Sequence, residues 1–246
     1  MHTLITGAAS GIGKAAAIRL ARRSAITVAD RNAAGAEDTV NAIRASGGKA
    51  QAIEVDVTDP GAVAGMVAQA EQGLGPIDAL FNNAGISIRK PVLQISGEEW
   101  DLMLNIHARG VFLVAQNVLR GMVQRGAGAI VNTSSDFAVI GVPNADAYCA
   151  AKTAIYSLTK ALSQEFAAHG IRVNAIGPGP IDTPILRSNR SEEEYARAVA
   201  ANVARTPMGR LGQPEEVASV VDFLLSDRAS YINGQLLQPN GGGVMW

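Results

Sequence analysis

Short apolar segments alternate with longer amphipathic or alanine-rich segments along most of the chain. The apolar segments are nearly all hydrophobic, which is typical of strands buried on both faces, and the longer segments have the end signals of helices. Strands are expected at residues 2–6, 25–30, 50–55, 77–82, 129–133, 171–176 and 235–238, and helices at 12–23, 33–46, 60–72, 97–125, 145–169, 191–204 and 214–225.

This alternation predicts a single α/β domain over residues 1–246. Right-handed crossovers between parallel strands give a doubly wound, Rossmann-type fold with about seven parallel strands and helices on both faces. Residues 183–213 form the one long irregular interval and are too polar for a core. This segment is expected to be a lid over a substrate site.

Composition narrows the class of protein. Of the 246 residues, 48% are hydrophobic and 17% charged, which excludes disorder as the main state. The formal net charge of −1 gives no basic field, so no nucleic-acid partner is expected. A single cysteine, no Cys/His cluster, no signal peptide and no unbroken apolar run of about 18 residues predict a cytoplasmic protein without a structural metal or a membrane span.

A glycine-rich loop follows the first expected strand, and a helix is expected to begin at once. Glycines let a backbone approach a pyrophosphate closely, and the free N–H groups at a helix N-terminus attract anions. A glycine-rich turn without a ligand is the alternative, because such loops are weak motifs by themselves. The cofactor-binding residues predicted here are Gly7, Ser10, Gly11, Ile12 and Gly13.

An acidic residue ends the second expected strand. Asp30 lies seventeen residues after Gly13, where a carboxylate would accept hydrogen bonds from the hydroxyl groups of an adenosine ribose. It would also repel a 2′-phosphate, so NAD is favoured over NADP. Arg31 weakens this preference because arginine pairs with phosphate. Asp30 could also cap the following helix, and the two roles are compatible.

Tyr148 and Lys152 are four residues apart in an expected helix, so they lie on one face, one turn apart. A nearby ammonium favours the phenolate and lowers the tyrosine pKa, which predicts a general acid/base usable near neutral pH. Ser135 lies thirteen residues before Tyr148, and its hydroxyl could hold a substrate oxygen. Chance pairs with this spacing are common, so the pair is informative only together with the serine and the glycine loop.

The joint order of these motifs resembles the short-chain dehydrogenase/reductase family over essentially the whole chain. The matching segments are TGAASGIG at residues 6–13, Asp56-Val57, NNAG at 82–85, Ser135, YCAAK at 148–152, and NAIGPG at 174–179 followed by Thr183. Several motifs in the right order are far more specific than any one of them.

The resemblance implies a role for each matching residue. Tyr148 would give or take the proton, and Ser135 would bind the substrate oxygen. Lys152 would hold the nicotinamide ribose and lower the pKa of Tyr148. The other cofactor residues that it implies are Asp56 and Val57 at the adenine, Asn83, Ala84 and Gly85 at the adenosine ribose, and Pro178, Gly179, Ile181 and Thr183 at the nicotinamide.

His107 stands where the family usually has an asparagine. It lies seven residues after Trp100 and five before Phe112, whereas Asn105 is two residues out of register, about 200° round a helix. In the family the main-chain carbonyl at this position would hold a water that extends a proton path from the lysine, and a histidine keeps that carbonyl. Its imidazole could also titrate near neutral pH. A tolerated replacement is the alternative.

Other residues bear on the substrate or on packing. Asp136 and Phe137 are expected to contact the substrate together with Ser135 and Tyr148, and further pocket candidates are Ser87, Arg89, Val142 and Asn144. Arg187 and Arg190 in the lid could meet an anionic substrate, although surface arginines are common. His2 and His169 are at element ends and are expected to be solvated.

These observations predict an enzyme that transfers a hydride between NAD and a secondary alcohol or ketone. A reductase of 3-oxoacyl thioesters that uses NADP is one alternative, and Asp30 counts against it. A dinucleotide-binding sensor without turnover is another, supported only by His107. The resemblance also implies a homotetramer in which the helices at 97–125 and 145–169 pair with their counterparts.

Overall fold

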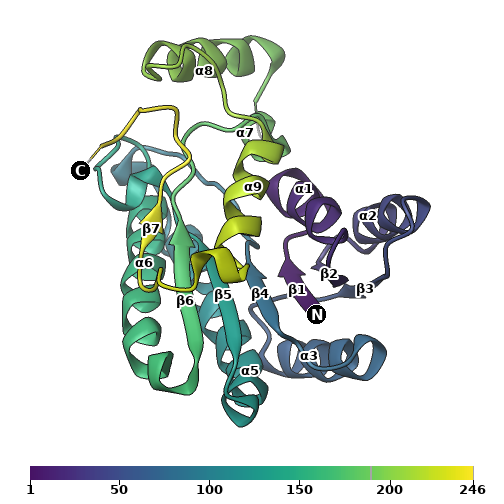
Figure 1. Cartoon of the computed structure of the whole chain (residues 1–246). Coiled ribbons are helices and arrows are strands. Elements are labelled where there is room, and N and C mark those ends of the chain that lie inside the picture. Colours follow the sequence, from purple (N-terminus) through teal and green to yellow (C-terminus); the bar gives the residue numbers. More distant parts are fainter. Residues whose placement is uncertain (189, 246) are drawn as a thin grey trace.

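Seven parallel strands form one sheet in the computed structural model, which describes residues 1–188 and 190–245 (Figure 1). The strand order is β3-β2-β1-β4-β5-β6-β7, so the direction of winding reverses between β1 and β4. This confirms the predicted fold. The strands are β1 (His2–Thr6), β2 (Ala25–Asp30), β3 (Ala50–Glu54), β4 (Ala79–Asn82), β5 (Gly128–Thr133), β6 (Ile171–Ile176) and β7 (Leu236–Leu237).

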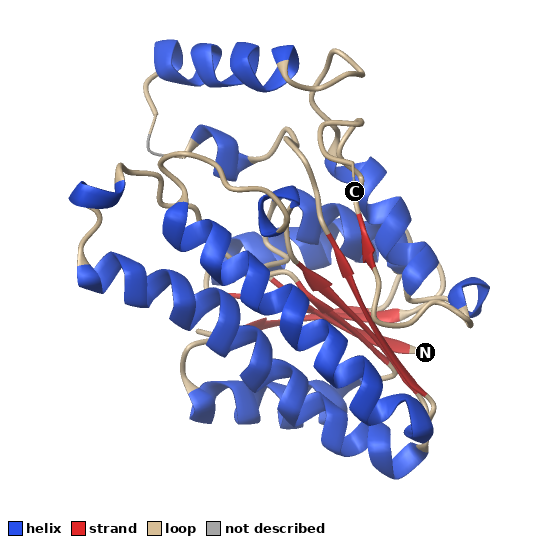
Figure 2. Cartoon of the chain, turned by 90° about the vertical axis from the view of Figure 1, so that its left-hand side faces the viewer, coloured by secondary structure: helices blue, strands red, loops and turns tan. Residues whose placement is uncertain are grey.

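Helices cover both faces of the sheet (Figure 2). One core contains apolar residues of α1 (Gly11–Leu20), α2 (Ala33–Ala45) and α9 (Pro214–Leu224). The other contains residues of α3 (Pro60–Leu74), α5 (Gly110–Arg125) and α6 (Asp146–Phe166). Each strand from β1 to β6 therefore contributes side chains to two cores, which explains the nearly continuous apolar runs. Short 3₁₀ turns lie at Val92–Gln94, Asp136–Ala138, Ala167–His169 and Asp227–Ala229.

The expected helix over 97–125 is divided into three parts. The α-helical parts are α4 (Gly97–Leu104) and α5, and between them Asn105–Arg109 is π-helical. The π-turn contains one extra residue, and the N–H of Gly110 donates to the carbonyl of Asn105. His107 is buried in this turn, whereas Asn105 is exposed. The irregular turn therefore lies at the position that the sequence singled out.

This same helical stretch bears on the membrane prediction. By length and composition alone, Gly97–Arg125 could span a bilayer, since its mean hydropathy is 1.2. The search for unbroken apolar runs did not detect this segment. In the fold 44% of that window is buried, and α5 packs on the sheet as a core helix. A core helix can have the same length and composition.

Residues 183–213 extend beyond the carboxyl ends of the strands. They contain α7 (Pro184–Arg187) and α8 (Glu192–Ala204), which lie at the top of the molecule in Figure 1. Ser191 caps α8 by accepting from the N–H of Glu194. The sequence did not predict α7, because a helix of four residues leaves no periodic pattern.

The expectation that His2 is solvated is wrong. His2 is 2% exposed, and its ring nitrogens contact the carbonyl oxygen of Gly75 at 2.7 Å and the hydroxyl of Thr27 at 2.8 Å. Both partners come from distant segments, so the position of His2 at a strand end did not indicate them. His169 is exposed, as expected.

Candidate active site

A pocket of about 630 Å³ opens at the carboxyl ends of the strands, around the point where the winding reverses. Ligands of doubly wound sheets bind at this place. Most of the residues predicted for the cofactor, substrate or catalysis line this pocket: Gly7, Ser10, Gly11, Ile12, Asp30, Arg31, Asp56, Val57, Asn83, Ala84, Gly85, His107, Ser135, Asp136, Phe137, Tyr148, Lys152, Pro178, Gly179, Ile181 and Thr183.

The glycine loop is built for close contacts. Gly7 and Gly11 have positive φ angles of 65° and 52°. A Cβ on Gly13 would lie 2.1 Å from the carbonyl oxygen of Gly7, so Gly13 closes the loop against itself and does not line the pocket. The N-cap Ser10 makes no side-chain capping bond, and the first N–H groups of α1 have no intrahelical acceptor. The loop therefore fits the pyrophosphate of a dinucleotide.

Two carboxylates lie at the end of the pocket that is predicted to hold the adenosine. Asp30 accepts from the backbone N–H of Ala9 and of Asn32, each at 2.9 Å. It does not cap α2, because that role falls to Asn32. Asp56 accepts from the N–H and the hydroxyl of Thr58, and these bonds hold the pKa of Asp56 below its usual value. Each carboxylate is thus fixed in place and retains lone pairs that can accept from a ligand.

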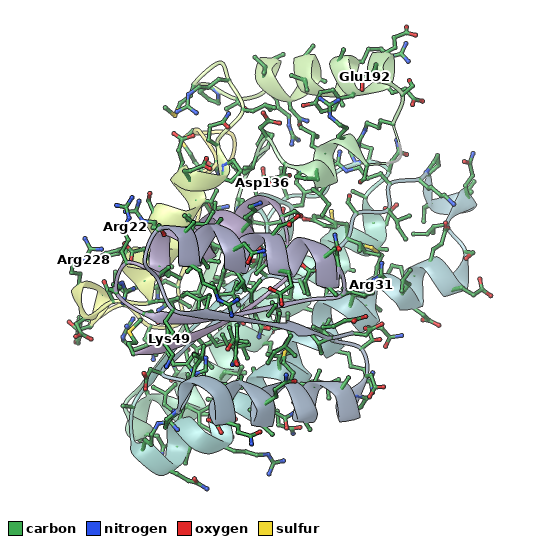
Figure 3. The ribbon with its side chains drawn as sticks, turned by 90° about the vertical axis from the view of Figure 1, so that its right-hand side faces the viewer. Arg22, Arg31, Lys49, Asp136, Glu192 and Arg228 are labelled. Carbon is green, nitrogen blue, oxygen red and sulfur yellow. The ribbon has the colours of Figure 1, made fainter. Side chains whose placement is uncertain are left out.

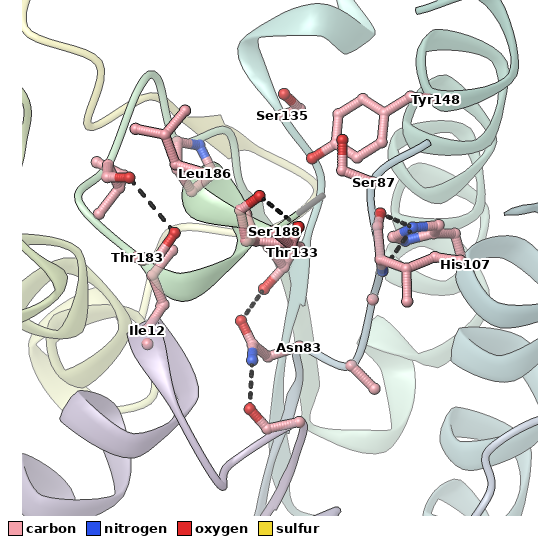
Figure 4. A pocket seen from close by; sticks show the side chains of 18 of the residues that line it. Ile12, Asn83, Ser87, His107, Thr133, Ser135, Tyr148, Thr183, Leu186 and Ser188 are labelled. Atoms are coloured by element: carbon pink, nitrogen blue, oxygen red, sulfur yellow. Dashed lines mark hydrogen bonds between the residues drawn. The ribbon is translucent and has the colours of Figure 1, made fainter. Parts of the chain in front are cut away.

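Asn83 joins three strands at the floor of the pocket. Its side chain donates to the carbonyl of Gly7 at 3.0 Å and accepts from the hydroxyl of Thr133 at 3.3 Å (Figure 4). Its backbone N–H donates to the hydroxyl of Thr6. These contacts hold the carboxyl ends of β1, β4 and β5 together.

Ser135 and Tyr148 lie together on one wall of the pocket (Figure 4). Ser135 follows β5 and begins the 3₁₀ turn, where its Oγ accepts from the N–H of Phe137 and donates to Oδ1 of Asp136 at 3.1 Å. Tyr148 is in the first turn of α6, and the ring of Phe137 packs edge-on against it with the centroids 6.0 Å apart. A substrate oxygen at this wall would meet both hydroxyl groups.

Lys152 is on the same face of α6 as Tyr148, as predicted. Its Nζ donates to the carbonyl of Thr133 at 2.8 Å and lies 5.5 Å from the centroid of the Tyr148 ring. Burial lowers the pKa of Lys152 to about 7. The side chain is 3% exposed, and one carbonyl oxygen compensates little of the lost hydration.

The prediction of an acidic phenol does not hold for the protein without a bound cofactor. Burial raises the pKa of Tyr148 to about 12, although the neighbouring Ser135 hydroxyl and the Arg89 charge act in the opposite direction. Removing a phenolate from water costs more than these groups return. Tyr148 therefore carries its proton at neutral pH in this state.

His107 is 1% exposed and packs edge-on against Tyr148, with the ring centroids 5.7 Å apart. Its Nε2 lies 2.9 Å from the carbonyl oxygen of Ile86 and 3.2 Å from the N–H of the same residue. Its Nδ1 is buried and has no hydrogen-bond partner among the described residues. Burial, and then the charge of Lys152, lower the pKa of His107 well below 6.5. The imidazole is therefore neutral near neutral pH, which favours a tolerated replacement over a group that titrates there.

Several lining residues escaped the sequence reasoning, and some candidates do not line the pocket. Val142, Asn144 and Arg187 are absent from the lining. The missed residues lie in the lid or beside the motifs, where only the fold brings them to the site: Val55, Ile86, Ile88, Ile106, Thr133, Ser134, Pro180, Pro184, Ile185, Leu186, Ser188, Asn202 and Arg205. Among the described residues, no group of three His, Cys, Asp or Glu side chains is arranged to hold a metal ion.

Known proteins match this chain over nearly its whole length. A family described as enoyl-(acyl carrier protein) reductase matches residues 7–243. Cis-4-hydroxycyclohexanecarboxylate dehydrogenase of Sinomonas cyclohexanicum is 42% identical over 240 residues, 97% of this chain and 94% of the relative. A 3-oxoacyl-[acyl-carrier-protein] reductase of Thermotoga maritima is 39% identical over 243 residues, 98% of this chain and 97% of the relative. The crystal structure of levodione reductase matches with a TM-score of 0.94 at 36% identity, over 98% of this chain and 96% of that chain.

The chain belongs to the short-chain dehydrogenase/reductase family, as its motifs predicted. It is an oxidoreductase of alcohol and carbonyl groups, and its family works with nicotinamide cofactors.

Proposed function

We propose that this protein catalyses the reversible reaction of a secondary alcohol with NAD⁺ to give a ketone, NADH and a proton, with Tyr148 as the general acid/base. The proposal rests on one observation: Ser135, Tyr148 and Lys152 line the same pocket as the glycine loop. A nicotinamide dinucleotide, when bound, supplies the hydride acceptor or donor. Most of the rate gain would come from orientation and from stabilised charge at the substrate oxygen.

Ser135 and Tyr148, on one wall of the pocket, have different roles in the proposed reaction. The Ser135 hydroxyl binds the substrate oxygen, and Tyr148 gives its proton to that oxygen during reduction. Because burial raises the pKa of Tyr148 to about 12, the phenol is ready to donate and must first lose its proton for alcohol oxidation. We therefore expect oxidation to accelerate as the pH rises between about 7 and 10, while reduction does not.

The main test replaces the phenol on α6. Tyr148→Phe should lower kcat by roughly 10²–10⁴ while leaving the melting temperature within a few degrees. Tyr156→Phe is the matched control, because this second tyrosine of α6 stacks on Lys160 and does not line the pocket. The assignment fails if Tyr148→Phe turns over at the wild-type rate.

The preference for NAD rests on Asp30. A carboxylate fixed by two backbone N–H groups would repel a 2′-phosphate, whereas Arg31, which also lines the pocket, would attract it. Asp30→Ser should raise the ratio of kcat/KM with NADP to that with NAD by at least tenfold. Arg31→Gln should not raise it. A wild-type enzyme that favours NADP would refute the preference.

A reductase of 3-oxoacyl thioesters is the second candidate, favoured by the similarity to the Thermotoga maritima enzyme. Measuring the oxidation of NADH and NADPH with an acetoacetyl thioester, and with a panel of ketones, distinguishes this candidate from the proposed alcohol dehydrogenase. Binding of NAD without turnover on any of these compounds would instead indicate a sensor. The cytoplasm and a homotetramer remain our expectations for location and assembly.

A further inference from the structure

The substrate end of the pocket carries positive charge that the proposed reaction does not use. Arg89, Arg190 and Arg205 all line the pocket, and Asp136 is the acidic side chain beside them. Among the described residues, none of the three arginines forms a salt bridge. By contrast, Arg187 in the same lid pairs with Glu192 outside the pocket. Arg190 donates to the carbonyl of Leu186, which leaves Arg89 and Arg205 as the guanidinium groups that are available to a ligand.

Two of these arginines are held beside the reacting phenol. The guanidinium carbons of Arg89 and Arg205 lie 4.9 Å and 5.1 Å from the centroid of the Phe137 ring. Phe137 in turn packs against Tyr148. A guanidinium that stacks on a ring uses its face, so its N–H groups remain free at the edge. No side-chain hydrogen bond of Arg89 or Arg205 to a described residue occupies them. These donors fit a carboxylate, which accepts paired N–H bonds.

A buried amide adds a donor at the same place. Asn202 of α8 lines the pocket and is 8% exposed, and its side chain makes no hydrogen bond with a described residue. The polar atoms of this amide are not fully enclosed, so they can bind a ligand or water in the pocket. A carboxylate held by the arginines would supply the missing acceptor.

Asp136 does not cancel this positive charge. Its carboxylate is 4% exposed and accepts from the Ser135 hydroxyl, so one of its oxygens is already engaged. Burial raises the pKa of Asp136, and the charges of Arg205 and Arg89 lower it. One carboxylate beside three guanidinium groups leaves an excess of positive charge that a neutral alcohol would not use.

We propose that the substrate is a compact secondary alcohol or ketone that carries a carboxylate, which Arg89, Arg205 and Asn202 bind while Ser135 and Tyr148 hold the reacting oxygen. The inference rests on the proposed function, since it names the substrate class of the same site. The short path from the arginines through Phe137 to Tyr148 requires a small spacer between the carboxylate and the carbinol carbon.

The test compares matched acidic and neutral alcohols with NAD. The acidic probes are the cis and trans isomers of 3- and 4-hydroxycyclohexanecarboxylate, and the neutral probe is cyclohexanol. We expect kcat/KM to be at least tenfold higher for one of the acids. Arg89→Gln and Arg205→Gln should each lower it ten- to hundredfold for that acid, mainly through KM, and should lower kcat/KM for cyclohexanol much less.

The matched control is Arg187→Gln. The Arg187 guanidinium stacks on Tyr195 and pairs with Glu192, so its loss should not change kcat/KM for the acid or for cyclohexanol. A second measurement needs no turnover: cyclohexanecarboxylate should bind the wild-type protein, as followed by calorimetry, at least tenfold more tightly than cyclohexanecarboxamide. Arg89→Gln should remove this difference.

The outcomes separate this inference from the proposed function. Equal turnover of acid and cyclohexanol, with the arginine variants impairing both equally, overturns the carboxylate site and leaves the dehydrogenase intact. Variants that impair only an acetoacetyl thioester overturn it as well and indicate a carrier-bound substrate. Absence of all turnover defeats the proposed function, and the calorimetric comparison then still decides whether the pocket selects a carboxylate.

Discussion

At the scale of single residues, Lys152 shows how the site departs from what stability alone would favour. Its ammonium is buried with one carbonyl acceptor, and burial lowers its pKa from 10.5 to about 7. The folded pKa is below the unfolded one, so between these pH values the unfolded chain binds more protons. The stability of the wild-type protein therefore rises with pH over this window.

Lys152→Met should make the fold more stable at pH 7 while abolishing activity. The pKa shift corresponds to at most about 5 kcal/mol, and losing the bond to Thr133 offsets part of it, so we expect a gain of roughly 2 kcal/mol. The gain should disappear near pH 10.5. Urea unfolding at both pH values measures it, with the exposed Lys160→Met as the control. A variant that is less stable than wild type at pH 7 contradicts the prediction.

His107→Asn tests the second buried titratable side chain beside Tyr148. An asparagine amide can donate to the carbonyl and accept from the N–H of Ile86 at once, whereas Nε2 of a histidine can do only one of these. Because the pKa of His107 is well below 6.5, the shape of the kcat/KM profile between about pH 6 and 9 should not change. Turnover should stay within about fivefold.

The same variant also reports on acid stability. The folded pKa of His107 is below its unfolded value of 6.5, so the wild-type protein loses stability as the pH falls below about 6.5, and His107→Asn should lose less. An inflection near neutral pH that disappears in the variant would show that the imidazole titrates during turnover, contrary to its burial.

At the scale of elements, the turn from β1 to α1 depends on a glycine that does not line the pocket. A Cβ on Gly13 would lie 2.1 Å from a backbone oxygen, which cannot move without opening the loop. Gly13→Ala should destabilise the fold by about 2 kcal/mol or more and weaken cofactor binding at least tenfold. A fluorescence titration with NADH and a thermal melt measure both effects.

Gly65→Ala in α3 is the matched control for that substitution. Nothing lies within 4 Å of the Cβ that would be added, so the change should stabilise the helix by about 0.5–1 kcal/mol. If Gly13→Ala binds NADH as tightly as the wild-type protein, the tight loop is not what shapes the phosphate site.

The sequence predicted the elements whose signals are local. The strands were visible because both of their faces are buried, and α3 was visible because Pro60 begins it, although it ends at Leu74 and not at Gln72. The π-turn at Asn105–Arg109 left no signal, since one inserted residue does not interrupt an apolar pattern. Local patterns cannot report an insertion that only backbone hydrogen bonds reveal.

The same distinction between local and non-local signals applies to the candidate site. Its motif residues were predicted by spacing and by the family resemblance, but Asn202 and Arg205 reach the pocket only because residues 183–213 fold back over the strand ends (Figure 3 shows Asp136 beneath α8, which begins at Glu192). The pKa of Tyr148 was predicted in the wrong direction for the same reason. Spacing identifies the nearby ammonium, whereas desolvation depends on everything packed around the phenol.

At the scale of the whole molecule, large apolar side chains are exposed on α4 and α5. Leu102 of α4 and Phe112 of α5 are each 43% exposed, and Trp100 is 38% exposed. These residues lie in residues 97–125, the first of the two segments that were expected to pair with a second copy. Grouped apolar residues on a surface commonly mark an interface between protein chains.

We therefore expect a homotetramer, with a light-scattering mass near four times the 25.5 kDa of the subunit. Phe112→Asp places a charge in the expected contact between α5 helices and should reduce the mass to one or two subunits, because an unpaired charge cannot be buried cheaply. Ile18→Asp is the control: Ile18 is 39% exposed on α1, which covers the other face of the sheet, so the mass should not change. A wild-type mass of one subunit refutes the assembly. Dissociation by Ile18→Asp alone would place the interface on the opposite side of the molecule.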